Sequence, residues 1–113
     1  MNRYVINQSL ARLDPDIKTL ATAARKERMA KGKLPLPPAS KEQYDSCMFR
    51  IAKLLTDSCF HPTPDRPWAE HSDLNHEEIR VAEAVLRLLA YADAKGLDVT
   101  SGIREIFAKE DWD

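Results

Sequence analysis

The sequence predicts an all-α protein, a bundle of four to five helices that forms a single domain over residues 1–113. Apolar residues recur at helical spacing in several segments, and no segment alternates apolar and polar residues as a strand does. Capping signals precede these segments and glycines follow two of them. A chain of 113 residues also has the size of one small domain.

The first clear helix is predicted to begin at Asp14, an N-cap residue that is followed by Pro15 at the first helical position. Gly32 is expected to end it. Residues 1–13 are compatible with a short helix or with an ordered arm. The segment 34–40, LPLPPAS, cannot continue a helix and is expected to be a stiff, extended connector.

Two further long helices are each predicted from a capping box, a polar N-cap residue followed three positions later by Gln or Glu. Ser40 and Gln43 begin the second, which is expected to reach about residue 59. Asn75 and Glu78 begin the third, and Gly96 suits the position just beyond its end. Three prolines make residues 60–74 irregular, and a short fourth helix is expected from about residue 99.

Apolar residues cover more than half of the predicted third helix, so that helix should be buried from two sides. One chain of this length offers few partner helices. We therefore predict a homodimer that buries part of the face formed by residues 79–92.

Composition and charge indicate a reduced, cytoplasmic, globular protein with no membrane association. Cys47 and Cys59 lie about 18 Å apart if they share one helix, too far for a disulfide. Residues 1–68 hold 12 Lys and Arg against 7 Asp and Glu, a net charge of +5; residues 69–113 hold 5 against 11, a net charge of −6. Such halves can attract each other within a fold or between copies, and they do not point to a nucleic-acid partner.

Three groups of residues are candidate sites. The basic segment 25–33 is either an interaction surface for phosphate or an acidic protein, or a solvated helix end, and its cations are Arg25, Lys26, Arg28, Lys31 and Lys33. Residues 70–78 are rich in His and acids, but His71 and His76 do not share a helix face, which favours capping over metal binding. Cys47 is best interpreted as a core residue, and no catalytic residue can be assigned.

The segment from Arg80 to Ile103, RVAEAVLRLLAYADAKGLDVTSGI, resembles the last motif helix of the MazG-like all-α nucleoside triphosphate pyrophosphohydrolases. In that family the helix begins Glu-x-x-Asp and ends Gly-Ile-Asp-Leu, and four clustered carboxylates bind Mg²⁺. The resemblance places Glu83 on the motif's Asp, as a candidate metal ligand. Arg80 stands where the motif has Glu, and Lys53 stands where the preceding helix should offer a carboxylate.

These departures imply a degenerate member that binds a nucleotide or a protein partner without catalysis. Lys53 and Arg80 would then hold the nucleotide in place of the metal. An active Mg²⁺-dependent pyrophosphohydrolase is the first alternative, and Mg²⁺ is the cofactor expected only in that case. A small helical accessory protein with no relation to the family is the second.

Overall fold

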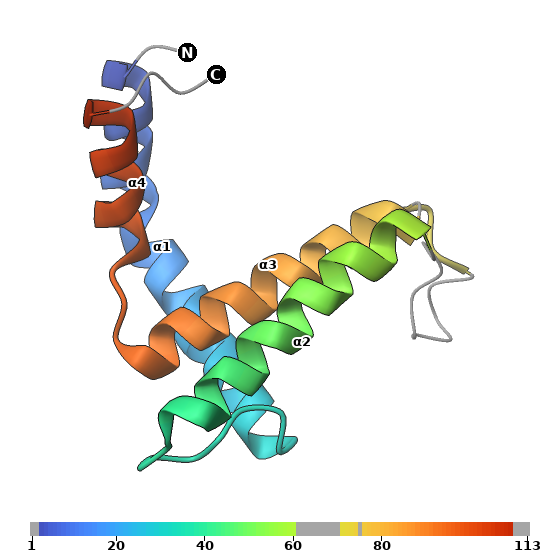
Figure 1. Ribbon diagram of the computed structural model, residues 1–113. Helices are drawn as coiled ribbons and strands as arrows, with labels where there is room; N and C mark the ends of the chain where they lie inside the picture. The colour runs from blue at the N-terminus through green and yellow to red at the C-terminus, as the bar shows by residue number, and fades with distance from the viewer. Residues whose placement is uncertain (1–2, 61–70, 75, 110–113) are drawn as a thin grey trace.

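The computed structural model describes residues 3–60, 71–74 and 76–109, and within them the only regular elements are four helices (Figure 1). These are α1 (Arg3–Ala30), α2 (Lys41–Phe60), α3 (His76–Lys95) and α4 (Val99–Lys109). The prediction of an all-α protein is confirmed, and four of the predicted four to five helices are seen in the described residues. None of the described helices is both long and apolar enough to cross a membrane.

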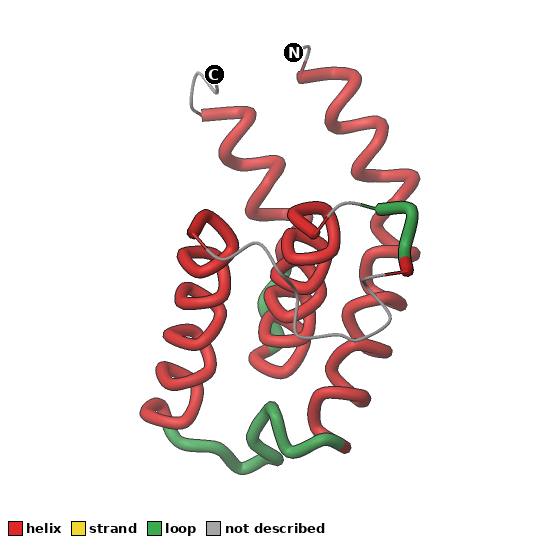
Figure 2. The backbone as a smooth tube through the Cα atoms, turned by 90° about the vertical axis from the view of Figure 1, so that its right-hand side faces the viewer, coloured by secondary structure: helices red, strands yellow, loops and turns green. Residues whose placement is uncertain are grey.

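Helix α3 is the centre of the arrangement. It packs against α1 on one side and runs antiparallel to α2 on another, while α4 packs against the first half of α1 (Figures 1 and 2). The molecule therefore has two arms, one formed by α2 and α3 and the other by α4 and the start of α1. The arms meet where α1 crosses α3.

Helix α1 corrects the prediction that the first helix begins at Asp14. It begins at Arg3 and continues through Pro15, and in Figure 1 it changes direction along its length. A proline inside a helix removes one backbone donor and bends the helix. The helix nevertheless continues because Ile6 and Leu10 are buried on the side where α4 packs, so tertiary contacts override the local stop signal.

Asp14 consequently has a tertiary role and does not cap a helix. Its Oδ1 accepts a hydrogen bond of 2.5 Å from Thr100 Oγ1, at the start of α4, and its Oδ2 lies 2.9 Å from Lys18 Nζ. These two interactions lower the pKa of Asp14. The carboxylate that the sequence assigns to a helix start therefore joins α1 to α4.

The predicted stops at Gly32 and Gly96 and the predicted cap at Ser40 are confirmed. Gly32 has a φ of +68°, and the backbone N–H groups of Gly32 and Lys33 donate to the carbonyls of Met29 (3.0 Å) and Arg28 (2.8 Å), the Schellman pattern. At the start of α2, Gln43 Oε1 accepts from the Ser40 N–H and Ser40 Oγ accepts from the Gln43 N–H. The proposed cap at Asn75 lies outside the described residues.

The core lies where the end of α1, the connector, α2 and the second half of α3 meet. Its buried members are Leu34, Cys47, Ile51, Ala90 and Tyr91. Tyr44 completes it by packing edge-on against Tyr91, with ring centroids 6.1 Å apart. Cys47 is thus a small core residue, as its position on the apolar face predicts.

Helices α1 and α2 cover two sides of α3, and a further side of α3 stays exposed in the single chain. Ile79, Ala84, Ala90 and Tyr91 are buried on the sides that face α1 and α2. Val81, Val85 and Leu88 form a second apolar stripe, and they are 48%, 49% and 39% exposed. The predicted burial from two sides is met by α1 and α2, and the apolar surface of α3 extends beyond both.

Candidate functional site

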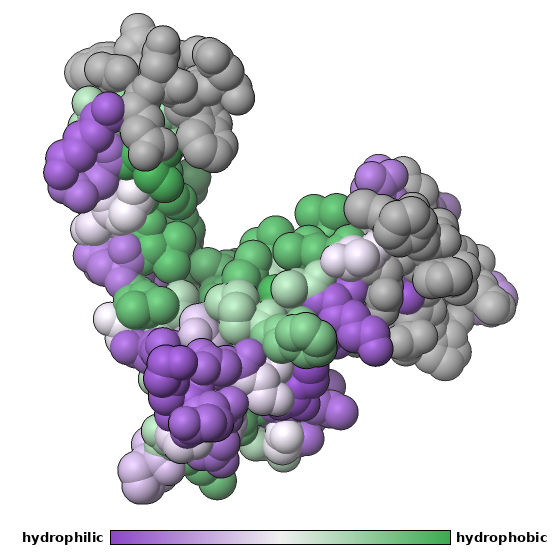
Figure 3. All heavy atoms as spheres, in the orientation of Figure 1, coloured by the Kyte–Doolittle hydropathy of each residue, from purple (hydrophilic) through white to green (hydrophobic). Residues whose placement is uncertain are grey.

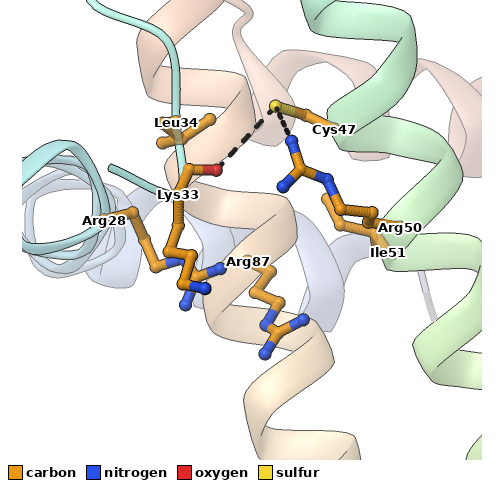
Figure 4. Close-up of a pocket in the computed structure, with 7 residues that line it drawn as sticks. All are labelled: Arg28, Lys33, Leu34, Cys47, Arg50, Ile51 and Arg87. Carbon is orange, nitrogen blue, oxygen red and sulfur yellow. Dashed lines mark hydrogen bonds between the residues drawn. The ribbon is translucent and has the colours of Figure 1, made fainter. Parts of the chain in front are cut away.

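Four cationic side chains converge on one cavity of about 120 Å³ beside the core (Figure 4). Arg28 comes from the end of α1, Lys33 from the connector, Arg50 from α2 and Arg87 from α3. Leu34, Cys47 and Ile51 form the apolar part of its wall. We call this the basic cavity; among its described lining residues there is no carboxylate.

The turn after α1 positions one wall of the basic cavity. Because Gly32 reverses the chain, Leu34 inserts into the core and the carbonyl of Lys33 accepts a 3.9 Å hydrogen bond from Cys47 Sγ. On the opposite wall, Arg50 Nη2 donates to the same sulfur over 3.8 Å, and Arg50 Nε donates to the Ser46 carbonyl over 3.5 Å. These long contacts leave most of the guanidinium donors available for a bound anion.

Arg87 has a carboxylate neighbour behind the cavity wall. Its Nη2 lies 4.0 Å from Glu83 Oε2, the i,i+4 arrangement that the spacing predicts. Glu83 and Arg80 are both buried on α3. Glu83 therefore lies between two cations of α3, Arg80 and Arg87, and offsets part of their positive charge.

Two neighbouring cavities extend the basic one through shared residues. A cavity of about 220 Å³ between α1 and α3 shares Arg28 and Arg87 and includes Glu83. Another, of about 370 Å³, shares Lys33, Leu34, Cys47 and Arg50 and extends past Gly32 and Ser46. A ligand larger than the basic cavity can thus continue along its wall.

The cations of segment 25–33 divide into three environments. Arg28 and Lys33 line the basic cavity. Arg25 Nε pairs with Asp93 Oδ2 at 2.5 Å, a bond between α1 and α3, and Lys31 Nζ pairs with Glu27 Oε1 at 2.9 Å on the surface. Lys26 is exposed. The segment is therefore partly structural and partly a ligand-facing wall.

The residues assigned by resemblance lie in different settings. Lys53 is exposed on α2, whereas Arg80 is buried on α3. The cavity that contains Glu83 is lined on its other side by α1, at Leu20, Ala23 and Ala24. The structure thus brings Glu83 toward the α1 side of the bundle.

The donor set around Glu83 does not fit a Mg²⁺ site. A hard cation needs several oxygen ligands, whereas the charged neighbours of Glu83 on α3 are Arg80 and Arg87, and the cavity that Glu83 lines offers one further carboxylate, Glu27 of α1. Within residues 3–60, 71–74 and 76–109, no three His, Cys, Asp or Glu side chains come together in a way that could hold a metal ion. Of segment 70–78, residues 70 and 75 and the side chain of His76 lie outside the described part, as does the side chain of Cys59.

Sequence reasoning missed Arg50 and Arg87 as members of a site. Each is a single cation among unlike neighbours on its helix, so no local charge cluster marks it. They meet Arg28 and Lys33 only because α2 and α1 pack on the same helix, α3. Arg28 and Lys33, which belong to a visible basic run, were found.

Comparisons with protein-family models, with curated proteins and with solved structures found no match for this chain.

Proposed function

We propose that the protein binds a phosphate-bearing ligand in the basic cavity and holds its phosphate groups with Arg and Lys side chains. The observation that carries this proposal is the convergence of Arg28, Lys33, Arg50 and Arg87 on one cavity. Four like charges repel one another and lower the stability of the fold. A bound polyanion offsets that repulsion.

The residue types favour phosphate over other anions. Arginine presents a planar fork of donors that matches the oxygens of a phosphate group, and three of the four cations are arginines. A charge-assisted hydrogen bond contributes about 1.5–3 kcal/mol. The basic cavity is small compared with the roughly 300–1,000 Å³ of typical ligand pockets, so it suits the phosphate end of a ligand.

The ligand class that we infer is a nucleotide. The adjoining cavity of about 370 Å³ begins at Lys33 and Arg50 and offers room for the sugar and base beside Pro35 and Gln43. The resemblance of residues 80–103 to MazG-like proteins supports the same class and is the basis for proposing a degenerate member of that superfamily. In this chain the cations, and not a metal ion, would neutralise the phosphates.

Titration of the protein with ATP, tripolyphosphate and inorganic phosphate in the absence of divalent metal tests the proposal. The expected result is a rise in melting temperature that grows with the number of phosphates. Arg50→Ala should weaken tripolyphosphate binding roughly 10- to 100-fold, because it removes charge-assisted hydrogen bonds while its own protein contacts are weak. Lys33→Ala should act in the same direction.

Lys26→Ala is the matched control, because Lys26 is an exposed cation of α1 that does not line the cavity. The affinity of Lys26→Ala for tripolyphosphate should stay within about twofold of the wild-type value, since a solvated surface charge contributes little to binding. Absence of any shift at millimolar tripolyphosphate contradicts the proposal. Loss of binding in Lys53→Ala but not in Arg50→Ala would move the site to the exposed side of α2.

The enzyme alternative has its own readout. Release of pyrophosphate from nucleoside triphosphates with Mg²⁺ or Mn²⁺, abolished by Glu83→Gln, would show that catalysis remains. Binding without such release supports the proposed role. The two assays separate a failed site from a site that binds and also reacts.

A further inference from the structure

The single chain has more surface than a monomer of its mass should have. Its accessible surface is 8180 Å², whereas the size scaling of monomeric proteins gives about 6,300 Å² for 12.9 kDa. Its radius of gyration is 15.7 Å against about 13 Å expected for a compact chain of this length. The excess of about 1,900 Å² exceeds the roughly 800 Å² that one partner contributes to a standard interface.

Exposed apolar side chains gather along α3. Figure 3 shows a band of hydrophobic side chains along α3 and along the inner side of the arm formed by α1 and α4. The exposed apolar residues of α3 include Val81, Val85 and Leu88, at positions i, i+4 and i+7 of one straight stripe. We call these three residues the α3 stripe.

We propose that a second copy of this chain covers the α3 stripe, with the two α3 helices antiparallel across a two-fold axis. A stripe of this kind is complementary to itself, because the two-fold places Val85 of each copy near Leu88 of the other. By spacing, Glu77 comes four residues before Val81 and Lys95 seven residues after Leu88, at the two ends of the stripe; both are exposed, and the Lys95 ammonium lies beside the rings of Tyr44 and Tyr91. An antiparallel pair brings each Glu77 toward the partner's Lys95, whereas a parallel pair would set like charges together.

Charge and size together favour a second copy over an unrelated partner. An isologous interface must be complementary to itself, and the opposite charges of Glu77 and Lys95 at the two ends of the stripe meet that requirement. The excess surface also has the magnitude that each protomer of an obligate dimer buries. This inference concerns a different surface from the basic cavity and does not depend on ligand binding.

Sedimentation velocity on the full chain at about 100 μM tests the inference. The wild type should sediment at twice 12.9 kDa. Val85→Glu should shift the protein to the monomer mass while circular dichroism still reports helix. Leu36→Glu is the matched control, because Leu36 is 67% exposed on the connector and is not part of the α3 stripe. This variant should dimerise like the wild type.

Exchanging the charges of Glu77 and Lys95 provides a second test in case Val85→Glu does not fold. Glu77→Lys alone should weaken dimerisation several-fold, and Glu77→Lys combined with Lys95→Glu should restore it. Lys95 also lies 5.4 Å from the ring centroids of Tyr44 and Tyr91, so rescue in the double variant is the informative result. A monomeric wild type, or a dimer that Val85→Glu and the charge exchange leave intact, overturns the proposal.

Discussion

Asp98 connects local capping chemistry to the pH dependence of the fold. Its carboxylate accepts hydrogen bonds from the Ser101 hydroxyl (2.6 Å) and the Ser101 backbone N–H (3.1 Å), which caps the start of α4. These bonds, with a further one from Thr100, lower the pKa of Asp98 to about 2. The Thr100 hydroxyl lies 2.5 Å from Asp14 Oδ1 and 3.1 Å from Asp98 Oδ1, and the two carboxylates compete for its one proton. Thr100 thereby links both carboxylates to the same helix start.

The first prediction concerns acid stability. The pKa of Asp98 is lower in the folded protein than the ordinary 3.8, so its stabilising contribution is present above about pH 4 and is lost as the pH falls toward 2. Between about pH 5 and pH 3, the melting temperature of Asp98→Asn should therefore fall by less than that of the wild type. Ser101→Ala should also flatten the profile, because it removes the largest cause of the shift. An unchanged profile in both variants would contradict this account of the cap.

The basic cavity shows at the residue scale which parts of a site are visible in a sequence. Arg28 and Lys33 belong to a run of cations, and a run can be recognised without a fold. Arg50 and Arg87 are separated from that run by 17 or more positions, and no local pattern links them to it. Which lone cations join a site depends on helix packing, which composition and spacing do not determine.

At the scale of the element, the accurate predictions are those that depend on local backbone chemistry. The cap at Ser40 and the stops at Gly32 and Gly96 involve hydrogen bonds within a few residues, so the sequence contains all the information they need. The predicted start of the first helix at Asp14 was wrong. Asp14 and Pro15 form a strong local signal for a helix start, whereas the burial of Ile6 and Leu10 depends on a helix that is distant in the sequence. Local signals therefore predict helix ends well until a tertiary contact competes.

A pair of glycine substitutions, one directly after α3 and one inside α4, isolates the backbone contribution of a glycine in the left-handed conformation. Gly96 has a φ of +68°, its N–H donates to Asp93, and the N–H of Leu97 donates to Ala92, so Gly96 ends α3 in a Schellman motif. Gly96→Ala should lower the free energy of unfolding by about 1 kcal/mol, since an L-residue is strained in the left-handed conformation. No atom lies within 4 Å of an added Cβ there, so a steric clash does not contribute.

Gly102 supplies the matched control on α4. An added Cβ also meets no atom within 4 Å, but Gly102 has ordinary helical geometry. Gly102→Ala should raise the free energy of unfolding by about 0.5–1 kcal/mol, because alanine loses less backbone freedom on folding. Urea denaturation of both variants measures the two signs. Equal effects at the two positions would show that the αL conformation at Gly96 does not determine the stop.

At the scale of the whole molecule, the fold follows from how the apolar surface of α3 is divided. Two sides of α3 pack against α1 and α2 and form the core, and the crossing with α1 also assembles the basic cavity. A further side forms the α3 stripe. The sequence predicts an apolar surface too wide for one partner, but it does not state which part the chain covers by itself, because that depends on the angles between helices.

The last prediction follows from that division. If the α3 stripe is buried between two copies, unfolding is coupled to dissociation and the melting temperature depends on protein concentration. A tenfold increase in concentration should raise the melting temperature by roughly 3–5 °C, because it adds about 1.4 kcal/mol to the stability of a dimer of this size. Thermal scans from about 5 to 500 μM measure it. Val85→Glu should melt at a lower temperature with no concentration dependence, and Leu36→Glu should retain the wild-type slope. A flat wild-type curve means that the two arms and the exposed stripe are stable in a single chain, and the excess surface must then have another role.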